Sequence, residues 1–509
     1  MKYIALGLVA LMLCGTVALA SDDSSGRTVI SANAISSGAA VEVADELAIG
    51  NPVDEKSDSA ALFKAITRVF TLVAVLVMLL VAITRWKIHP FLALLISSLL
   101  LGPVSGLAPM ETVESFLSGF AGTMKWIGVV IVLGALIGEL LSQSGGTLKI
   151  AHTILDFVGT KRLPLAMGLT GYVVSIPAFV DIAYIMLRPI VEVLAVKSRR
   201  NVLVVGLSLA AGLTASHALL PPTPGPLATA AILDADIGRV IMINVVVAAF
   251  AVLGGLLWAT LYCRNVRLPE DDALRDKLHQ STTEDQCESE ASPSFFSAIA
   301  PILLPLVLIA VGALLSNEQE DGLAAIVQFL SMPVVALLCG ILVGMFLLRR
   351  GTRLAKLSGL VEKSIESSAV VLMITAAGGG FGGVIKATGV GDDIAAMFVQ
   401  SHLPSILFPF LLAATLTTAT GSLTVSMVTS SSVVASMLPS LGLSPEFAVA
   451  LIGAGSLCII HANSSFFWLL SRLHNIPPDV LYRTYSVQSV CMSLGGLMGA
   501  FLLHLFGVT

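Results

Sequence analysis

Charged side chains are scarce in this 509-residue chain, in which 12% of the residues are charged and 56% are hydrophobic. A soluble globular protein has roughly a quarter of its residues charged, so too few polar groups are present to cover a water-facing surface. The six cysteines are scattered without a CxxC pair or a metal-ligand spacing, and we expect them to pack as small apolar residues. Apolar and polar residues do not alternate as they would in a transmembrane barrel. The composition therefore predicts an α-helical membrane protein.

Apolar runs about 20 residues long, the length that a helix needs to cross a bilayer, recur along the chain. The predicted spans are 65–83, 89–108, 126–143, 201–219, 236–261, 298–316, 322–348, 360–384, 446–462 and 485–507. Lys and Arg gather at 161–162, 197–200, 264–267 and 349–356, which places these segments on the cytoplasmic side. The connector 316–321 has neither residue and is expected outside.

The termini of the spans suggest five regions. Residues 1–20 resemble a signal peptide, with Lys2, a short apolar stretch and small residues before Ser21; an uncleaved anchor is the alternative. Residues 21–62 predict an exported, acidic, flexible tail. We then expect a first transmembrane repeat at 63–262, a cytoplasmic linker at 263–296 and a second repeat at 297–509.

Two apolar stretches predict re-entrant hairpins rather than simple spans. Residues 163–196 have basic residues at both ends, so both ends are expected in the cytoplasm, with a tip near 175–177. Residues 404–438 are similar, with a polar tip near 417–422. Non-helical backbone at membrane depth is tolerated only where protein buries it or where it lines a wet cavity. Such tips indicate a binding site, although a pair of ordinary tight spans is the alternative.

An internal repeat appears when the chain is shifted by 244 residues. Gly134, Gly138 and Gly145 then fall on Gly378, Gly382 and Gly389, and His217-Ala218 falls on His461-Ala462. Each half contains about five spans and one hairpin, and an odd number of spans inverts the second half relative to the first. The predicted fold class is an all-α polytopic membrane protein with two inverted repeats, which is a transporter architecture.

Three motifs carry the candidate chemistry. Four prolines between Pro221 and Pro226 must break a helix, and broken helix ends attract carboxylates; a surface turn is the alternative. His217 and His461 occupy the same repeat position and could carry protons, or they could simply pack. Asp181 follows the first hairpin tip, where an intramembrane carboxylate is usually functional, although it could cap a helix. The glycines 378–383 are expected to pack helices closely.

These segments together resemble the gluconate permease family, within a larger ion-transporter superfamily. The resemblance runs in the family's order from about 130 to 475, through Pro177-x-Phe179-x-Asp181, Pro221-Pro222-Thr223-Pro224-Gly225-Pro226-Leu227 with Ala235-Asp236-Ile237-Gly238, Gly379 with Lys386 to Asp392, Gly421-Ser422-x-Thr424-Val425-x-Met427, Gly453 to Ser456, and His461-x-Asn463 with Phe467-Trp468. It implies a symporter that imports gluconate or a related sugar acid with protons, by an elevator-like motion, in an inner-membrane homodimer with an exported N-terminal tail.

The resemblance also implies a site. Substrate is expected to contact Ser175, Thr223, Thr420, Gly421, Ser422, His461, Asn463 and Ser464, with Asp181 and His217 handling protons. Three positions depart from the family pattern: Ser464 replaces an acidic residue, Thr420 a glutamine and Thr417 an arginine. Loss of an arginine removes a bidentate partner for a carboxylate. A sodium-coupled carboxylate transporter therefore stays open, with a channel or an intramembrane enzyme as less favoured classes. We expect no enzymatic activity, cofactor, bound metal or nucleic-acid partner.

Overall fold

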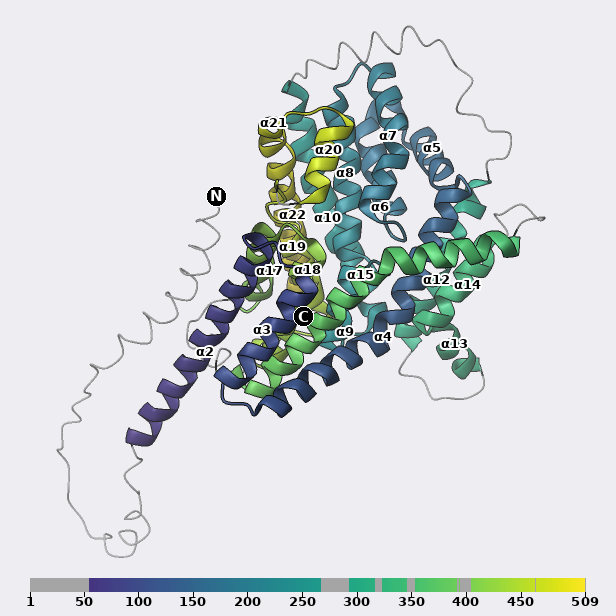
Figure 1. Cartoon of the computed structure of the whole chain (residues 1–509). Coiled ribbons are helices and arrows are strands. Elements are labelled where there is room, and N and C mark those ends of the chain that lie inside the picture. The colour runs from purple at the N-terminus through teal and green to yellow at the C-terminus, as the bar shows by residue number, and fades with distance from the viewer. Residues whose placement is uncertain are drawn as a thin grey trace, which may run out of the picture.

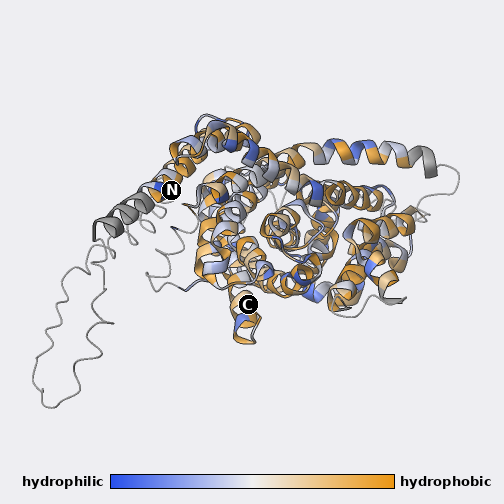
Figure 2. Cartoon of the chain, turned by 90° about the horizontal axis from the view of Figure 1, so that it is seen from below, coloured by the Kyte–Doolittle hydropathy of each residue, from blue (hydrophilic) through white to orange (hydrophobic). Residues whose placement is uncertain are grey.

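The computed structural model describes residues 55–266, 293–315, 323–345, 353–390, 393, 404–462 and 464–508. The predicted signal peptide, most of the predicted tail and linker, and Asn463 lie outside these residues. The described part of the chain is helical throughout, without a β-strand (Figure 1). Figure 2 shows that hydrophobic residues dominate the helical body. The predicted all-α membrane fold is therefore confirmed.

The helices of the first half are α2 (Glu55–Thr84), α3 (Pro90–Val104), α4 (Pro109–Gln143), α5 (Gly146–Val158), α6 (Leu163–Val174), α7 (Val180–Lys197), α8 (Val202–Leu219), α9 (Pro224–Leu233) and α10 (Ile237–Leu261). Those of the second half are α12 (Phe295–Leu315), α13 (Leu323–Ser331), α14 (Pro333–Met345), α15 (Arg353–Thr388), α17 (Leu407–Thr420), α18 (Leu423–Leu441), α19 (Pro445–Ser456), α20 (Ser465–Leu473), α21 (Pro478–Arg483) and α22 (Tyr485–Leu505). Among the described residues, seven helices are long and apolar enough to cross a membrane, or up to nine if each bent pair counts as one span.

Three predicted spans had wrong boundaries. The span 126–143 is the second part of α4, which begins at Pro109 because a proline suits the first helical turn; Glu111 and Glu114 hid this part from a search for apolar runs. The span 322–348 is two helices bent by 73°, since Pro333 opens α14. The span 446–462 ends early, at Ser456.

Two repeat-related helices, α4 and α15, cross along much of their length. Gly119 lies against the backbone of Gly379 at one end of the crossing. Further along α4, the Glu139 carboxylate pairs with the Lys363 ammonium at 2.5 Å. Residue numbers rise along α4 while they fall along α15, so the two helices are antiparallel. The glycines permit this close approach, which confirms the packing role predicted for 378–383.

A second repeat-related pair, α10 and α22, packs in the same way. Gly254 lies against the carbonyl of Cys491, and a Cβ on Gly495 would be 2.5 Å from the carbonyl oxygen of Phe250. These contacts again run in opposite directions along the two helices. Antiparallel repeat mates are the arrangement that an inverted repeat requires. They support the repeat, which as a whole stays a prediction.

Helix bounds support the same register. Adding 244 to the bounds of α4, 109–143, gives 353–387, and α15 is Arg353–Thr388. Adding 244 to the bounds of α7, 180–197, gives 424–441, and α18 is Leu423–Leu441. The two predicted hairpins are therefore each a pair of helices joined by a short turn, α6 with α7 and α17 with α18.

Candidate functional site

The tip of the first hairpin is the turn 175–179 between α6 and α7. Ser175 is fully buried, and its hydroxyl donates to the carbonyl oxygen of Ala178 at 3.1 Å, which closes the turn. Gly138 of α4 lies against the carbonyl of Pro177. Because residue 138 has no side chain, α4 can pass directly over the tip.

The proline segment breaks the chain between α8 and α9, as predicted. Helix α8 ends at Leu219, and the Pro221-Pro222 peptide bond is cis. The Asn244 side chain of α10 donates to the otherwise orphaned carbonyl of Leu219 at 2.6 Å. Thr223 is the N-cap of α9, but its hydroxyl turns back to the Leu220 carbonyl instead of capping the helix. Asn244 thus allows a helix end to be buried within the fold.

The hairpin tip and the proline break face each other across a small cavity with about 240 Å³ of empty space. Its lining residues come from α4, the tip, the end of α8 and the break: Ile131, Gly134, Ala135, Pro177, Ala178, Phe179, His217, Pro222, Thr223 and Pro224. The ring of His217 lies 6.2 Å from that of Phe179. Its Nδ1 atom is buried and has no hydrogen-bond partner among the described residues. A polar ligand in the cavity would satisfy this atom.

The N-termini of α7 and α9 both open on this cavity, through their N-cap residues Phe179 and Thr223. Neither N-cap side chain bonds to its helix. In α7 the first backbone N–H with an intrahelical partner is that of Ala183, which bonds to Phe179 at 3.0 Å. Free N–H groups and the helix dipole attract anions. The geometry therefore favours a negatively charged group near the start of α7, the helix whose first turn holds Asp181.

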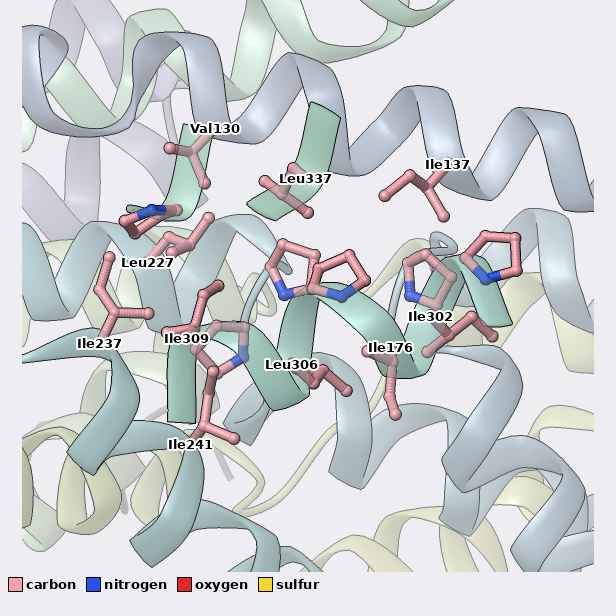
Figure 3. Close-up of a pocket in the computed structure, with 16 residues that line it drawn as sticks. Val130, Ile137, Ile176, Leu227, Ile237, Ile241, Ile302, Leu306, Ile309 and Leu337 are labelled. Atoms are coloured by element: carbon pink, nitrogen blue, oxygen red, sulfur yellow. The ribbon is translucent and has the colours of Figure 1, made fainter. Parts of the chain in front are cut away.

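A larger apolar cavity with about 380 Å³ of empty space adjoins the first one (Figure 3). Val130 and Ile137 of α4 point into it from one side, and Leu306 and Ile309 of α12 lie on the other. All of its lining residues are apolar, and six of them are proline. An ion would lose its hydration there without replacement. A polar ligand is thus confined to the side of the smaller cavity that holds His217.

The second hairpin tip has a different geometry. Helix α17 ends at Thr420, and Gly421 turns the chain in the left-handed region with φ of 75°, which glycine adopts without strain. The Ser422 hydroxyl caps α18 by accepting from the N–H of Val425 at 3.4 Å. The Thr420 hydroxyl donates to the Leu416 carbonyl at 2.8 Å. The hydroxyls of Thr420 and Ser422 are therefore satisfied within the turn, which carries no charge.

His461 lies against this second tip. Its Nε2 atom is 2.9 Å from the Thr418 carbonyl oxygen, which can only accept, so Nε2 carries the proton. The buried Ser464 donates its backbone N–H to the His461 carbonyl at 2.8 Å. Ser464 is also the N-cap of α20, without a side-chain bond to that helix.

The predicted site residues thus fall into two groups in this conformation. Thr223 and His217 line the small cavity, with Ser175 and Asp181 at its hairpin tip, whereas Thr420, Gly421, Ser422, His461 and Ser464 surround the second tip. Neither the 240 Å³ cavity nor the 380 Å³ cavity is lined by a residue of the second group. The two groups are linked through α9 and α18, where a Cβ on Gly225 would be 2.8 Å from the Met427 sulfur.

Sequence reasoning did not select several buried hydroxyls. Ser216, Thr429 and Ser430 have side-chain oxygens without a partner among the described residues. Ser432 lies in the same run, and its hydroxyl donates to the Gly378 carbonyl at 2.7 Å, joining α18 to α15. The run of hydroxyl residues 429–432 in an apolar hairpin leg was the signal available. Within the described residues, no group of three or more His, Cys, Asp or Glu side chains could hold a metal ion.

Comparison with known proteins identifies the family. The model of the GntP family permeases matches residues 66–506. This chain belongs to the GntP permease family. The chain is 35% identical to the gluconate permease of Pseudomonas aeruginosa over 434 residues, which cover 84% of this chain and 95% of that protein. It is 30% identical to the high-affinity gluconate transporter of Escherichia coli, and the match covers 84% of this chain and 97% of that protein. It is also 30% identical to the D-serine transporter DsdX of Escherichia coli, and that match covers 86% of this chain and 98% of that protein.

Solved structures share the fold of this GntP family member. The YdaH transporter of Alcanivorax borkumensis aligns with a TM-score of 0.57 at 16% identity, covering 82% of this chain and 99% of that chain. MtrF of Neisseria gonorrhoeae aligns with a TM-score of 0.55 at 16% identity, covering 98% of this chain and 94% of that chain. The expected resemblance to gluconate permeases is therefore confirmed, and the protein is a multi-pass membrane protein of a transporter family.

Proposed function

We propose that this protein imports gluconate or a related sugar acid by symport with protons across the inner membrane. The observation that carries this proposal is the small cavity at which the N-termini of α7 and α9 meet beside His217. Two relatives are named for gluconate. The second hairpin tip lacks the arginine that the family resemblance led us to expect, so backbone N–H groups and helix dipoles would bind the carboxylate instead.

The geometry also supplies a reason for coupling. A substrate carboxylate at the start of α7 would share that helix terminus with the carboxylate of Asp181, in the first turn. Two like charges at one site disfavour each other, and a proton on Asp181 removes the repulsion. Binding of the anion would therefore favour binding of a proton, which is what symport requires.

The remaining predicted residues complete the proposed site. His217 and Thr223 would contact substrate from the proline break, and Ser175 would hold the first tip in shape. Thr420, Gly421, Ser422, His461 and Ser464, together with Asn463, would close on the substrate from the second tip. We propose that this closure accompanies an elevator-like movement of the hairpins against a scaffold, in a homodimer whose N-terminal tail is exported.

Uptake of labelled gluconate tests the proposal. Cells that lack their own gluconate transport would express the chain, with and without a proton gradient and with sodium present or absent. We expect saturable uptake that collapses with the proton gradient, and a loss of that dependence in Asp181→Asn. Asp156→Asn, on α5 and away from the cavity, is the matched control. Uptake that needs only sodium would refute proton coupling, and absence of labelled gluconate uptake would refute the substrate.

A further inference from the structure

A buried polar chain lies on α7, outside the candidate cavity. The Tyr184 hydroxyl is 3.0 Å from Nε2 of His474, the residue that follows α20. His474 Nδ1 is 3.6 Å from Oε1 of Glu192, and Arg188 Nε donates to the same oxygen at 2.7 Å. Tyr184 is fully buried and His474 is 8% exposed. Polar groups this deep are costly unless their positions serve a purpose.

The surrounding helices are shaped to hold this chain. A Cβ on Gly206 of α8 would be 2.5 Å from the Tyr184 hydroxyl and 3.8 Å from His474 Nε2, so only glycine leaves room for the pair. The Tyr184 ring meets the His474 ring edge-on, with centroids 5.8 Å apart and an interplanar angle of 81°. The ring of Phe466 meets Tyr184 in the same way at 5.5 Å. Three helices thus fix the geometry of one hydrogen bond.

The chain leads from the candidate site toward the C-terminal end of α7. Asp181, Tyr184, Arg188 and Glu192 are spaced at three or four residues and therefore share one face of the helix. At about 1.5 Å of rise per residue, they extend over about 16 Å.

The two charged side chains beyond Tyr184 on α7 are more exposed than Tyr184 itself. The side chain of Glu192 is 22% exposed and that of Arg188 is 41% exposed, whereas Tyr184 is buried. Helix α7 then ends at Lys197, in the basic segment that the sequence predicts to be cytoplasmic. Among the described residues, the charged or titratable groups that interact with His474 are Tyr184, Glu192 and Arg188, all from α7; α8 contributes only Gly206.

We propose that Tyr184, His474 and Glu192 form a proton relay between Asp181 and the cytoplasmic end of α7. A proton arriving at the Tyr184 oxygen releases the hydroxyl proton to Nε2 of His474. The N–H bond at Nδ1 then breaks and its proton passes to the Glu192 carboxylate, so one proton enters and one leaves. The 3.6 Å step needs a small approach or one bridging water. Arg188 Nε donates to the same Glu192 oxygen and so holds this carboxylate in place at the end of the relay.

This proposal rests on proton symport, so its test separates coupling from transport. The full chain would be purified and reconstituted in vesicles. One assay measures exchange of labelled against unlabelled gluconate, which needs no net proton movement. The other measures net uptake driven by an inward pH gradient. The variants are His474→Gln, Tyr184→Phe and Glu192→Gln, with His152→Gln and Tyr262→Phe as matched controls.

We expect the three relay variants to exchange gluconate within about fivefold of the unaltered protein, since a single hydrogen bond contributes only about 1 kcal/mol. Their gradient-driven uptake should fall roughly 100-fold, the scale of a lost proton-transfer group. The controls should lose neither activity. Glu192→Gln is nearly isosteric at a partly exposed position, so it tests the relay even if the buried variants do not fold.

Two outcomes would overturn the relay alone. Glu192→Gln and His474→Gln could retain full gradient-driven uptake, or they could lose exchange and uptake equally while keeping the melting temperature of the unaltered protein. The second result would assign the chain a structural role. If the unaltered protein exchanges gluconate but ignores the pH gradient, the proton symport proposed above fails and the relay fails with it. An unaltered protein that exchanges no gluconate would refute the substrate instead.

Discussion

The crossing of α4 and α15 gives a stability prediction with an internal control. In Gly383→Ala, the new Cβ would be 2.5 Å from the carbonyl oxygen of Ser115 and 3.4 Å from the Cα of Gly119. Ordinary contacts begin near 3.4 Å, so the helices must separate locally by about 0.9 Å. The obstacle is backbone and cannot rotate away. Gly359→Ala, on the same helix, meets nothing within 4 Å.

The magnitude follows from the difference between these two variants. Replacing glycine by alanine in a helix stabilises it by about 1 kcal/mol, and this gain is common to both. Overpacking costs about 1–3 kcal/mol and applies to Gly383→Ala alone. The free energy of unfolding of Gly383→Ala should therefore lie about 1–3 kcal/mol below that of Gly359→Ala.

Thermal unfolding in detergent, followed by tryptophan fluorescence, measures this difference. We expect the midpoint of Gly359→Ala at or above that of the unaltered protein and the midpoint of Gly383→Ala clearly below it. A rescue experiment sharpens the test. A Cβ on Gly380 would meet the Phe116 ring at 2.6 Å and the Phe116 carbonyl oxygen at 2.9 Å, so Phe116→Leu should relieve the larger part of the Gly380→Ala clash and none of the Gly383→Ala clash. Equal midpoints for the two alanine variants would refute the helix crossing as described.

Three further predictions concern single side chains. Asp236→Ala removes the carboxylate that caps α10 at the N–H of Arg239, 2.8 Å away, and should lower the free energy of unfolding by about 1 kcal/mol; Asp236→Asn should retain most of it in the same thermal assay. Lys363→Ala leaves the 9% exposed carboxylate of Glu139 without its ion-pair partner, and the cost should be about 1–2 kcal/mol because the lysine is largely exposed. Adding Glu139→Gln should recover part of that loss, and a double-mutant cycle measures the coupling. His217→Phe should raise the KM for gluconate by about tenfold, the effect of losing one buried hydrogen bond, while His152→Phe should not; an unchanged KM in uptake kinetics would remove His217 from the site.

The sequence predicted the fold class because its signals are local. Apolar runs, basic loops and the four prolines at 221–226 each act within a few residues, and the break before α9 follows directly from proline chemistry. The structure confirms that break and the two hairpin turns. The start of α4 at Pro109 was missed because Glu111 and Glu114 interrupt its apolar pattern, although charge does not prevent a helix from continuing.

The site was less predictable because it depends on contacts between distant segments. The meeting of Phe179 with Thr223 and His217 requires α4 to pass over the hairpin tip at Gly138. The sequence shows that a close packing contact is possible at Gly138, but it does not show which segment of backbone makes that contact. The pairing of Tyr184 with His474, 290 residues apart in sequence, is invisible for the same reason. The predicted site residues at the two hairpins also belong to separate regions of this structure.

The 244-residue shift relates two contacts within the α4–α15 crossing that are stabilised by different forces. The shift carries Gly119 onto Lys363 and Glu139 onto Gly383. The contact of Gly119 with Gly383 and the ion pair of Glu139 with Lys363 are therefore the same position viewed from the two halves. One end is held by short-range dispersion, which loses about a quarter to a half of its strength over a gap of roughly 0.5–1 Å. The other is held by a Coulomb attraction that decays slowly and weakens with salt. If the two halves exchanged conformations, the free energies of these two contacts would therefore not be equivalent. Ionic strength would change the free energy of the ion pair alone.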